Sequence, residues 1–425
     1  MRNFKNNRSF YNKRTKSFLT GLLSKVFNFF KNYPEINVSL YDNRKNKFDN
    51  KNTALSMPKL EGIELRNYQK EAINLFIKSN RGIIAACTGS GKTEMAIAIF
   101  KALNVPTLWI THRKELMYQT ADRFQKRFPE IKDKIGFIGD GEFTPNFLTF
   151  ATVQTIFSTL KKSELKELNN YGFLIIDEAH RSKAKSFYKT AMLCNNAFYR
   201  LALTATPFKR DDDFEDMMLT GITGRISSKI TLSDLIDKEY LAKPLFKYYD
   251  VNSPFISPTE SWSETYKKGI VFNEERNNII IESLKELIDL KKKTLIIIKS
   301  LDHADVLFDI AKEQNINIVK LTGKNSVTER QDALSRLTNG KLDSIIASEI
   351  FDEGIDIPKL DAVILAAGGK DPIAFYQRVG RVLRKKEGNN YCIIIDFFDK
   401  FNSKLFRHSQ RRLEFVKQEK SFKIV

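Results

Sequence analysis

The chain is poor in cysteine and histidine, the residue types that form disulfides in small folds or bind metals. Its 425 residues include three cysteines and four histidines. The cysteines, Cys87, Cys194 and Cys392, lie far apart, and no two of them form a Cys-x-x-Cys pair. This spacing argues against a disulfide framework, a zinc site and an iron–sulfur cluster, and it is typical of proteins in a reducing compartment.

Long hydrophobic runs are missing as well, and acidic residues are in deficit. No apolar stretch approaches the roughly 20 residues needed to span a bilayer, so we expect no membrane partner. The chain has 70 Lys and Arg residues against 51 Asp and Glu, a formal net charge of +19. Such an excess favours an anionic partner such as nucleic acid, although Lys- and Asn-rich coding would produce the same excess.

The chain does contain enough apolar residues for more than one core, since 42% of it is hydrophobic and its length suits two or three domains. From residue 58 short apolar strands alternate with helical segments such as 71–78 and 114–127, which predicts parallel sheets covered on both faces. The predicted strands are 82–87, 107–111, 135–138, 147–152, 173–177 and 200–204, then, after a connector at 232–244, 294–299, 316–321, 344–347, 362–365 and 391–396.

We therefore predict an α/β protein with two tandem parallel-sheet domains, at 58–228 and 229–400. A basic accessory region would precede them at 1–57, and a C-terminal helix would close the chain at 401–425. The segment 252–264 reads as irregular surface. Four aromatic residues in or near it could stack on bases exposed at a DNA junction, but we favour their packing against a helix at 277–291. They are Phe255, Trp262, Tyr266 and Phe272.

Acidic residues are absent altogether from residues 1–34, which hold eight basic ones. Apolar residues between 18 and 30 fall on one half of a helical wheel, which predicts an amphipathic helix. The alternation of Ile36, Val38 and Leu40 predicts a strand after it. An acid-free start with Arg and Ser is also typical of a mitochondrial transit peptide. Because the pattern continues into a strand and a basic loop, we interpret the segment as a basic accessory region that would grip nucleic acid.

The stretch 82–93, GIIAACTGSGKT, carries the clearest chemical signal. An apolar strand, a glycine-bearing loop and a helix follow one another, which is the context of a phosphate-binding loop, although Ala86 replaces the first glycine of the general pattern. Lys92 would reach the β- and γ-phosphates, and the Thr93 hydroxyl would hold Mg²⁺. Backbone and side-chain contacts to the nucleotide are expected from Thr88, Gly89, Ser90, Gly91, Lys92 and Thr93.

Two adjacent acids, Asp177 and Glu178, end another apolar strand. Ligands of α/β sheets bind at the carboxyl ends of strands, so these acids would lie near the phosphate loop. Asp177 would share the Mg²⁺ with Thr93, and Glu178 would orient and deprotonate the attacking water. Alone, such a pair is usually a helix cap or a solvated turn; beside a phosphate loop the catalytic interpretation is favoured.

These two stretches resemble motifs I and II of superfamily 2 helicases, and further stretches resemble the family's other motifs in the family's order over about residues 60 to 400. They are LRNYQ at 65–69, THRKEL at 111–116, TVQT at 152–155, LTATP at 203–207, KS at 299–300, LTGK at 321–324, ASEIFDEGIDIP at 347–358 and QRVGRVLR at 377–384.

The resemblance implies two RecA-like domains with ATP between them, and it assigns roles by position. Arg381 and Arg384, three apart on one side of a predicted helix, would act as arginine fingers. Further nucleotide contacts are implied for Gln69, Gly354, Asp356 and Gln377, and coupling of nucleotide state to movement for His180, Thr204 and Thr206. Nucleic-acid contacts are implied for Thr111, His112, Arg113, Thr152, Gln154, Lys299, Ser300, Thr322, Gly323 and Ser348.

Details of the motifs resemble the XPB and UvsW branch of DNA enzymes. Motif II reads Asp-Glu-Ala-His, and motif VI begins with Gln377 and ends with Leu383 and Arg384. This branch implies an ATP- and Mg²⁺-dependent DNA helicase acting on forked or branched DNA as a monomer in the cytoplasm, with a mitochondrial site as the alternative. A duplex-DNA translocase without strand separation, an RNA helicase and a binding protein with a decayed ATPase are the other hypotheses, and the intact catalytic positions argue against decay.

Overall fold

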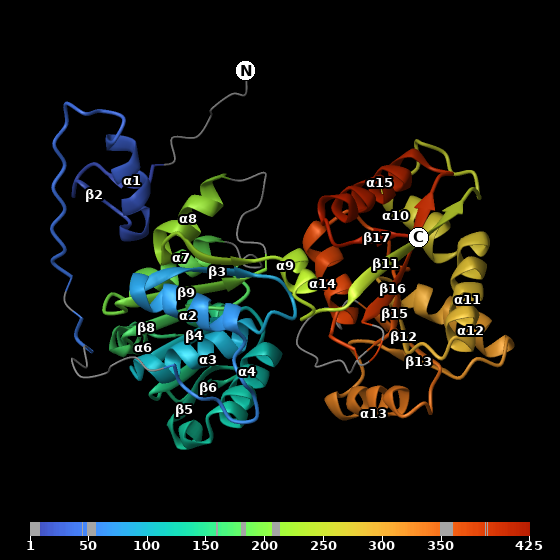
Figure 1. Ribbon diagram of the computed structural model, residues 1–425, viewed down its shortest axis with the longest axis horizontal. Helices are drawn as coiled ribbons and strands as arrows, with labels where there is room; N and C mark the ends of the chain where they lie inside the picture. Colours follow the sequence, from blue (N-terminus) through green and yellow to red (C-terminus); the bar gives the residue numbers. More distant parts are fainter. Residues whose placement is uncertain are drawn as a thin grey trace. The chain divides into compact units, whose positions relative to one another are not determined.

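The computed structural model describes residues 9–44, 46–48, 57–158, 160–179, 184–205, 213–348, 360–386, 388 and 390–425. The chain divides into two compact units, residues 1–230 and 231–425 (Figure 1). Each unit contains one large, mainly parallel sheet with helices packed against it. The predicted α/β class with two parallel-sheet domains is therefore confirmed. Among the described residues, no helix is both long enough and apolar enough to cross a membrane.

The first unit is built on an eight-stranded sheet of order β10-β3-β9-β8-β4-β7-β5-β6. Neighbouring strands pair in parallel, except for the short hairpin of β5 and β6. The strands are β3 (Arg81–Ala86), β4 (Thr107–Thr111), β5 (Ile135–Gly139), β6 (Glu142–Phe143), β7 (Leu148–Thr152), β8 (Phe173–Ile176), β9 (Tyr199–Thr204) and β10 (Ile226–Ile230). The six strands predicted here agree with the structure to within one residue at each end, because buried parallel strands read as continuous apolar runs.

Helices cover both faces of this sheet (Figure 1). They are α2 (Asn67–Ser79), α3 (Lys92–Leu103), α4 (Lys114–Arg127), α5 (Val153–Ser158), α6 (Lys162–Glu167), α7 (Ala184–Leu193) and α8 (Asp213–Thr223), with short 3-10 turns at η2 (Pro129–Lys134) and η3 (Leu168–Asn170). The boundaries of α4 are as predicted. Helix α2 begins four residues before its predicted start at residue 71, because the Gln69 side chain accepts a hydrogen bond from the Arg66 backbone N–H at 2.8 Å and caps the first turn.

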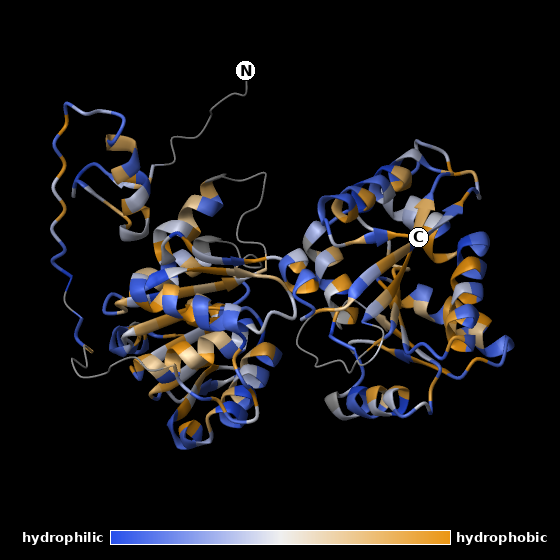
Figure 2. Cartoon of the chain, in the orientation of Figure 1, coloured by the Kyte–Doolittle hydropathy of each residue, from blue (hydrophilic) through white to orange (hydrophobic). Residues whose placement is uncertain are grey.

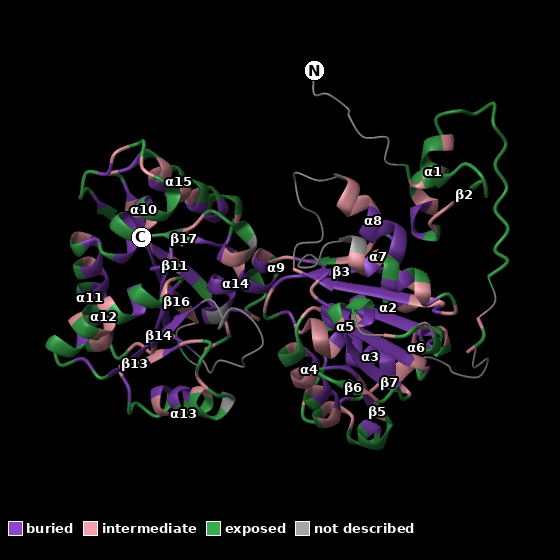
Figure 3. Ribbon diagram, turned by 180° about the vertical axis from the view of Figure 1, so that it is seen from behind, coloured by how far each residue is buried: buried purple, intermediate pink, exposed green. Residues whose placement is uncertain are grey.

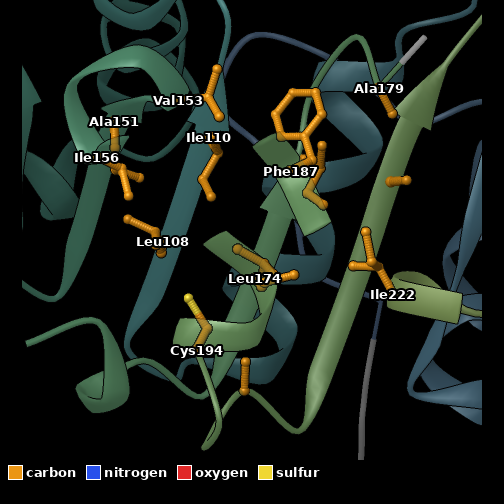
Figure 4. Close-up of a cluster of buried hydrophobic side chains, with 14 of the residues drawn as sticks. Leu108, Ile110, Ala151, Val153, Ile156, Leu174, Ala179, Phe187, Cys194 and Ile222 are labelled. Atoms are coloured by element: carbon orange, nitrogen blue, oxygen red, sulfur yellow. The ribbon is translucent and has the colours of Figure 1, made fainter. Parts of the chain in front are cut away.

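One core joins the central strands to the covering helices. Leu108 and Ile110 of β4 and Leu174 of β8 are fully buried and lie in the same cluster as Phe187 of α7 (Figure 4). Burying a side chain of this size contributes roughly 1.5–3 kcal/mol. This cluster therefore fixes the strands whose carboxyl ends carry the predicted site.

The N-terminal residues pack onto the first unit. They form a hairpin of β1 (Tyr11–Asn12) and β2 (Ser17–Phe18), the turn η1 (Thr20–Leu22) and helix α1 (Leu23–Phe30). The Phe10 ring stacks on that of Phe214 in α8 at 4.5 Å, and a Cβ on Gly21 would clash with the carbonyl of Thr220. The amphipathic helix is confirmed, but it begins after the hairpin and the 3-10 turn and not at Phe18.

The strand predicted around Ile36, Val38 and Leu40 is wrong. Residues 37–40 have no regular structure, and the three side chains are 45%, 38% and 60% exposed. Figure 3 shows this segment in the colour of exposed residues. Alternating apolar residues form a strand only where a neighbouring strand supplies hydrogen-bond partners, and none of the described strands pairs with these residues.

The second unit is built on a seven-stranded sheet of order β13-β14-β12-β15-β16-β11-β17, and its pairings are parallel. The strands are β11 (Lys243–Val251), β12 (Thr294–Ile298), β13 (Ile318–Leu321), β14 (Ser344–Ser348), β15 (Ala362–Ile364), β16 (Tyr391–Asp399) and β17 (Lys423–Ile424). In Figure 2 the hydrophobic colour concentrates on strands such as these, and the helices carry many hydrophilic residues. The five predicted strands are confirmed, and β11 and β17 were missed.

The helices of this unit are α9 (Leu232–Asp237), α10 (Trp262–Tyr266), α11 (Glu274–Asp289), α12 (Leu301–Glu313), α13 (Val327–Thr338), α14 (Pro372–Val382) and α15 (Ser403–Gln418), with a π-helical turn η4 (Lys267–Val271) after α10. Packing of the aromatic residues against α11 was the favoured prediction, and it is wrong for three of them. Phe255 is 87% exposed and Phe272 is 54% exposed. Trp262 contacts His408 of α15 instead, with ring centroids 4.9 Å apart.

Candidate active site and nucleic-acid interface

The phosphate-binding loop lies between β3, which ends at Ala86, and α3, which begins at Lys92. Gly89 and Gly91 have φ values of 82° and 78°, in the left-handed region that glycine adopts without steric cost. A Cβ on Gly91 would also overlap the Gln69 side-chain amide. Both glycines are therefore needed for the tight turn that brings the loop amides to the amino terminus of α3.

Lys92 is held across this loop. Its Nζ donates a hydrogen bond to the carbonyl of Ala86 at 3.0 Å and lies 3.4 Å from that of Cys87. A polyphosphate would offer the same ammonium group a stronger, charged acceptor. The structure thus places the predicted phosphate cation at the mouth of the loop, bound to neutral groups that a nucleotide can replace.

Gln69 and its neighbour Tyr68 brace the loop. The Gln69 amide and the Tyr68 hydroxyl each donate to the carbonyl of Ser90 at 2.9 Å. Sequence reasoning selected Gln69 for adenine and missed Tyr68, whose adjacency to Gln69 was the available signal. The Ser90 hydroxyl is buried and, among the described residues, has no hydrogen-bond partner. An unpartnered buried hydroxyl in a phosphate loop fits a site that is completed by a ligand.

Asp177 and Glu178 follow β8, as expected. The Asp177 carboxyl is buried, and burial together with the charge of Glu178 raises its pKa to about 7, while Lys92 acts in the opposite direction. Glu178 has φ 45°, a strained value for a residue with a side chain. The Asp177 backbone N–H donates to Ile110 on β4 at 2.9 Å, and that of Ala179 donates to Leu203 on β9 at 3.1 Å, so both neighbouring strands hold the turn.

These residues suit a bound Mg²⁺. The pKa of the buried Asp177 carboxyl is raised, and a bound cation would favour its ionised form. Thr93 offers a hydroxyl in the first turn of α3. Oxygen donors of this kind are the ligands that Mg²⁺ takes, usually together with water and substrate phosphates. The donor set therefore fits the ion that a nucleotide would bring.

The nucleic-acid motifs of the first unit lie side by side. Thr111 and Thr152 end the adjacent strands β4 and β7 and are register partners. The Gln154 side chain donates to the carbonyl of His112 at 2.8 Å, which joins the loop after β4 to helix α5. Arg113 precedes the first turn of α4. The residues that the resemblance selected from two distant stretches are thus brought together at one sheet edge.

The second unit repeats this arrangement. Lys299 and Ser300 follow β12, Ser348 ends β14, and Thr322 and Gly323 follow β13. The three strands are neighbours in the order β13-β14-β12. Because all three are parallel, their carboxyl ends meet at one edge, where Arg330 of α13 donates to the carbonyls of Thr322 and Gly323 at 3.2 Å.

Motif VI differs from the prediction in one respect. Helix α14 ends at Val382, and Arg384 lies beyond it in a bridge with Leu241, so Arg381 and Arg384 do not share a helix face. The Ala242 backbone N–H donates to the carbonyl of Leu383 at 2.7 Å and directs the chain away from the helix. Gln377, the first residue of motif VI, and its neighbour Arg378 are buried.

Several predicted residues lie outside the part of the chain that the structure describes. They are His180, Thr206, Gly354 and Asp356, together with the side chain of Arg381. Thr204, the remaining residue with a predicted coupling role, ends β9 and is buried.

Sequence reasoning missed a group of arginines that fixes the entry to α14. Arg276 of α11, Arg378 of α14 and Arg412 of α15 donate to the carbonyls of Ala366, Gly368 and Gly369 at 2.9, 3.2 and 2.7 Å. Two of them are also paired with buried acids of β16, Arg276 with Asp399 at 3.0 Å and Arg412 with Asp396 at 2.8 Å. The available signal was the pair of acids inside an apolar strand, since buried charges are normally paired.

Comparisons with known proteins agree with this architecture. The family described as "Type III restriction enzyme, res subunit" matches residues 62–209, and "Helicase conserved C-terminal domain" matches residues 277–386. The "DNA 3'-5' translocase XPB2" of Sulfurisphaera tokodaii is 29% identical over 395 residues, which cover 83% of this chain and 85% of that protein. The "ATP-dependent DNA helicase uvsW" of Enterobacteria phage T4 is 26% identical over 355 residues, 79% of this chain and 69% of that protein.

A solved structure shares the fold. A variant of S. cerevisiae Dbp5, bound to RNA and ADP BeF3, aligns with a TM-score of 0.60 at 15% identity over 84% of this chain and 88% of that one. With the phosphate loop, the acidic turn and two parallel-sheet units, these matches define an ATP-hydrolysing helicase of superfamily 2. Within that superfamily the chain belongs to the XPB and UvsW type.

Proposed function

We propose that the protein is an ATP-dependent DNA helicase or translocase that remodels forked and branched DNA during repair, recombination or replication. The support comes from the similarity to proteins named as a DNA 3'-5' translocase and an ATP-dependent DNA helicase, and from the net charge of +19. By the same similarity, translocation runs 3′ to 5′ along the bound strand.

One observation carries the coupling of ATP to DNA in this proposal. The sheet order β3-β9-β8-β4-β7 puts the phosphate loop, Thr204 and Asp177 at the ends of the first three strands, and Thr111 and Thr152 at the ends of the next two. The hydrogen bond from Asp177 N to Ile110 O joins the two groups. A shift of the acidic turn on hydrolysis would therefore reach the DNA-contacting loop through a single strand pairing.

We assign the chemistry of hydrolysis to six side chains. Lys92 binds the phosphates, and Thr93 and Asp177 would hold a Mg²⁺, which would supply charge stabilisation to the transferred phosphoryl group. Glu178 orients the attacking water and accepts its proton. Arg384 donates hydrogen bonds to the phosphoryl oxygens in the transition state. Arg381 shares that role, with nucleotide contacts from Gln69, Gly354, Asp356 and Gln377 and coupling through His180, Thr204 and Thr206.

We assign strand contacts to the two clusters of strand-end residues. Backbone amides and hydroxyls at strand and helix ends position phosphates without reading bases, which suits a motor that moves along any sequence. They include Thr111, His112, Arg113, Thr152 and Gln154 in the first unit and Lys299, Ser300, Thr322, Gly323 and Ser348 in the second. We further propose a monomer acting in the cytoplasm, in keeping with the small number of cysteines and their wide spacing along the chain.

ATPase and strand-displacement assays test this function. Forked DNA, a four-way junction, blunt duplex DNA and RNA of matched length are compared, with Lys92→Ala as the inactive control. We expect DNA to stimulate hydrolysis more than RNA does, and branched substrates to be resolved faster than blunt duplex. Equal stimulation by RNA would favour an RNA helicase. Stimulation by DNA without displacement of any strand would favour a duplex translocase.

A further inference from the structure

The two tryptophans of the chain have opposite environments. Trp109 is fully buried in the core of the first unit, and Trp262 is 44% exposed on helix α10 of the second. The short helix α10 is anchored at its other end, because Thr265 is fully buried and the Tyr266 hydroxyl donates to the carbonyl of Ala367 at 3.1 Å. Trp262 is therefore held by an anchored helix and remains partly accessible to solvent.

The indole belongs to a row of rings that starts at a predicted nucleic-acid contact. Lys299, which follows β12, lies 6.0 Å from the centre of the Tyr266 ring. The Tyr266 ring lies 6.1 Å from that of Trp262, and Trp262 lies 4.9 Å from that of His408 on α15. Consecutive members of the row are thus in contact, and they connect Lys299 at the strand-end cluster of the second unit to His408 on α15.

Three cationic side chains, Lys370, Arg407 and Arg412, lie near His408 at the α15 end of this row of rings. Burial, Lys370, Arg412 and Arg407 lower the pKa of His408 to about 4, so its imidazole is neutral at physiological pH and lies among positive charges. Lys370 and Arg407 are exposed. The nearby acid Glu260 is paired with Lys268 at 2.8 Å, and Glu264 is exposed on α10 itself. Accessible aromatic faces beside cations are the combination that binds unpaired strands, where rings stack on bases and cations meet phosphates.

We propose that Trp262 and Tyr266 form a stacking site for unpaired bases, which extends the strand contact from Lys299 towards α15. The inference rests on the proposed function and specifies the form of its substrate. A base inside a duplex is already stacked on its neighbours, so an indole face can engage only a base that has left the helix. The site would therefore favour single-stranded tails and the open centre of a fork.

Tryptophan fluorescence tests this site directly, because Trp109 is buried and Trp262 is the accessible emitter. The protein is titrated with single-stranded oligodeoxythymidine and, separately, with blunt duplex DNA of the same length. We expect the single strand to quench the emission and the duplex to quench it much less. Trp262→Phe should abolish the quenching and keep the affinity for the single strand within about twofold, because a phenyl ring still stacks.

Trp262→Ala should weaken single-strand binding by about tenfold and change duplex binding by less than about twofold. Phe272→Ala is the matched control, since Phe272 is exposed in the same connection but has no ring contact to the row; its affinity should remain that of the parent protein. Quenching that persists in Trp262→Phe, unchanged binding in Trp262→Ala, or an equal loss in Phe272→Ala would each overturn the proposal.

The outcome is separable from that of the proposed function. Basal ATPase of Trp262→Ala should match that of the parent chain, because the ring contacts of Trp262 are with Tyr266 and His408 and not with residues assigned to the nucleotide. If the parent protein displaces strands and Trp262→Ala binds single strands normally, the stacking site alone is refuted. If the parent protein shows no DNA-stimulated ATPase at all, the proposed function itself is refuted.

Discussion

Two buried aspartates, one in each unit, stand in opposite situations. Asp396 of β16 accepts three hydrogen bonds from the Arg412 guanidinium at 2.8 to 3.1 Å, so the protein supplies its counter-ion. Asp177 is also buried, but burial and Glu178 raise its pKa to about 7. A buried carboxylate with a raised pKa is suited to bind a cation that arrives with a ligand. A buried carboxylate that is paired with an arginine of the same unit stabilises the structure instead.

Two arginines of the second unit extend the comparison and provide a test on the catalytic side. Arg412 is paired with Asp396, whereas Arg384 lies half-buried beyond α14, where its backbone bridges to Leu241. Replacing Arg384 with Ala should lower ATP turnover by about 10³-fold, with a smaller loss of ATP affinity, because a finger acts on the transition state. Steady-state ATPase and nucleotide binding measure the two effects, with the exposed neighbour Lys385→Ala as control. A change confined to KM would remove Arg384 from the catalytic residues.

Glu178 provides a second test on the catalytic side. Glu178→Gln keeps the size of the side chain and removes the proton acceptor, so turnover should fall by about 10²- to 10⁴-fold. ATP should still bind, since the phosphate loop is untouched. Single-turnover hydrolysis and nucleotide binding measure both properties. Near-normal turnover in this variant would show that another group accepts the proton.

The two aspartates themselves should respond differently to the same substitution. Asp396→Asn leaves Arg412 buried without its counter-charge and should lower the free energy of unfolding by about 3–5 kcal/mol. Asp177→Asn removes a buried charge that forms no ion pair with any of the described residues, so it should not lower the melting temperature, although it should abolish hydrolysis. Thermal and denaturant melts of both variants, without nucleotide, measure the difference. Equal destabilisation would contradict the distinction drawn here.

The smallest expected effect concerns the N-terminal segment. Lys13, Arg14, Lys25 and Lys31 are exposed, and we propose that they contact DNA phosphates. Each lost phosphate contact reduces the slope of log affinity against log salt by about 0.9 on duplex DNA, so replacing all four with Gln should reduce it by about 3 to 4. Affinities across a salt series measure this slope, and basal ATPase should persist. An unchanged slope would mean that the segment only packs on the first unit.

The local sequence pattern was sufficient to predict an element wherever the residues of that element alone determine its structure. Buried strands such as β4 and β12 were predicted because both of their faces are apolar, and the phosphate loop was recognised because its glycines, Lys92 and Thr93 are contiguous. The pattern failed where a strand owes its conformation to a partner. β17 has only two residues, β10 carries Ser227, Ser228 and Lys229, and β11 carries Pro244 and charged residues, yet each pairs with a strand far away in the sequence.

The sequence by itself determined the two α/β units, the order of the motifs and the residue types that can bind a nucleotide and Mg²⁺, because these depend on local hydrophobic periodicity and on contiguous chemistry. Only the tertiary structure decided that α14 ends before Arg384, that Arg412 neutralises Asp396, and that Trp262 presents an open ring beside Tyr266. Each of these features depends on groups that are far apart in the chain. A local sequence pattern does not determine which distant side chains will contact or pair with a given residue, or whether that residue will stay exposed.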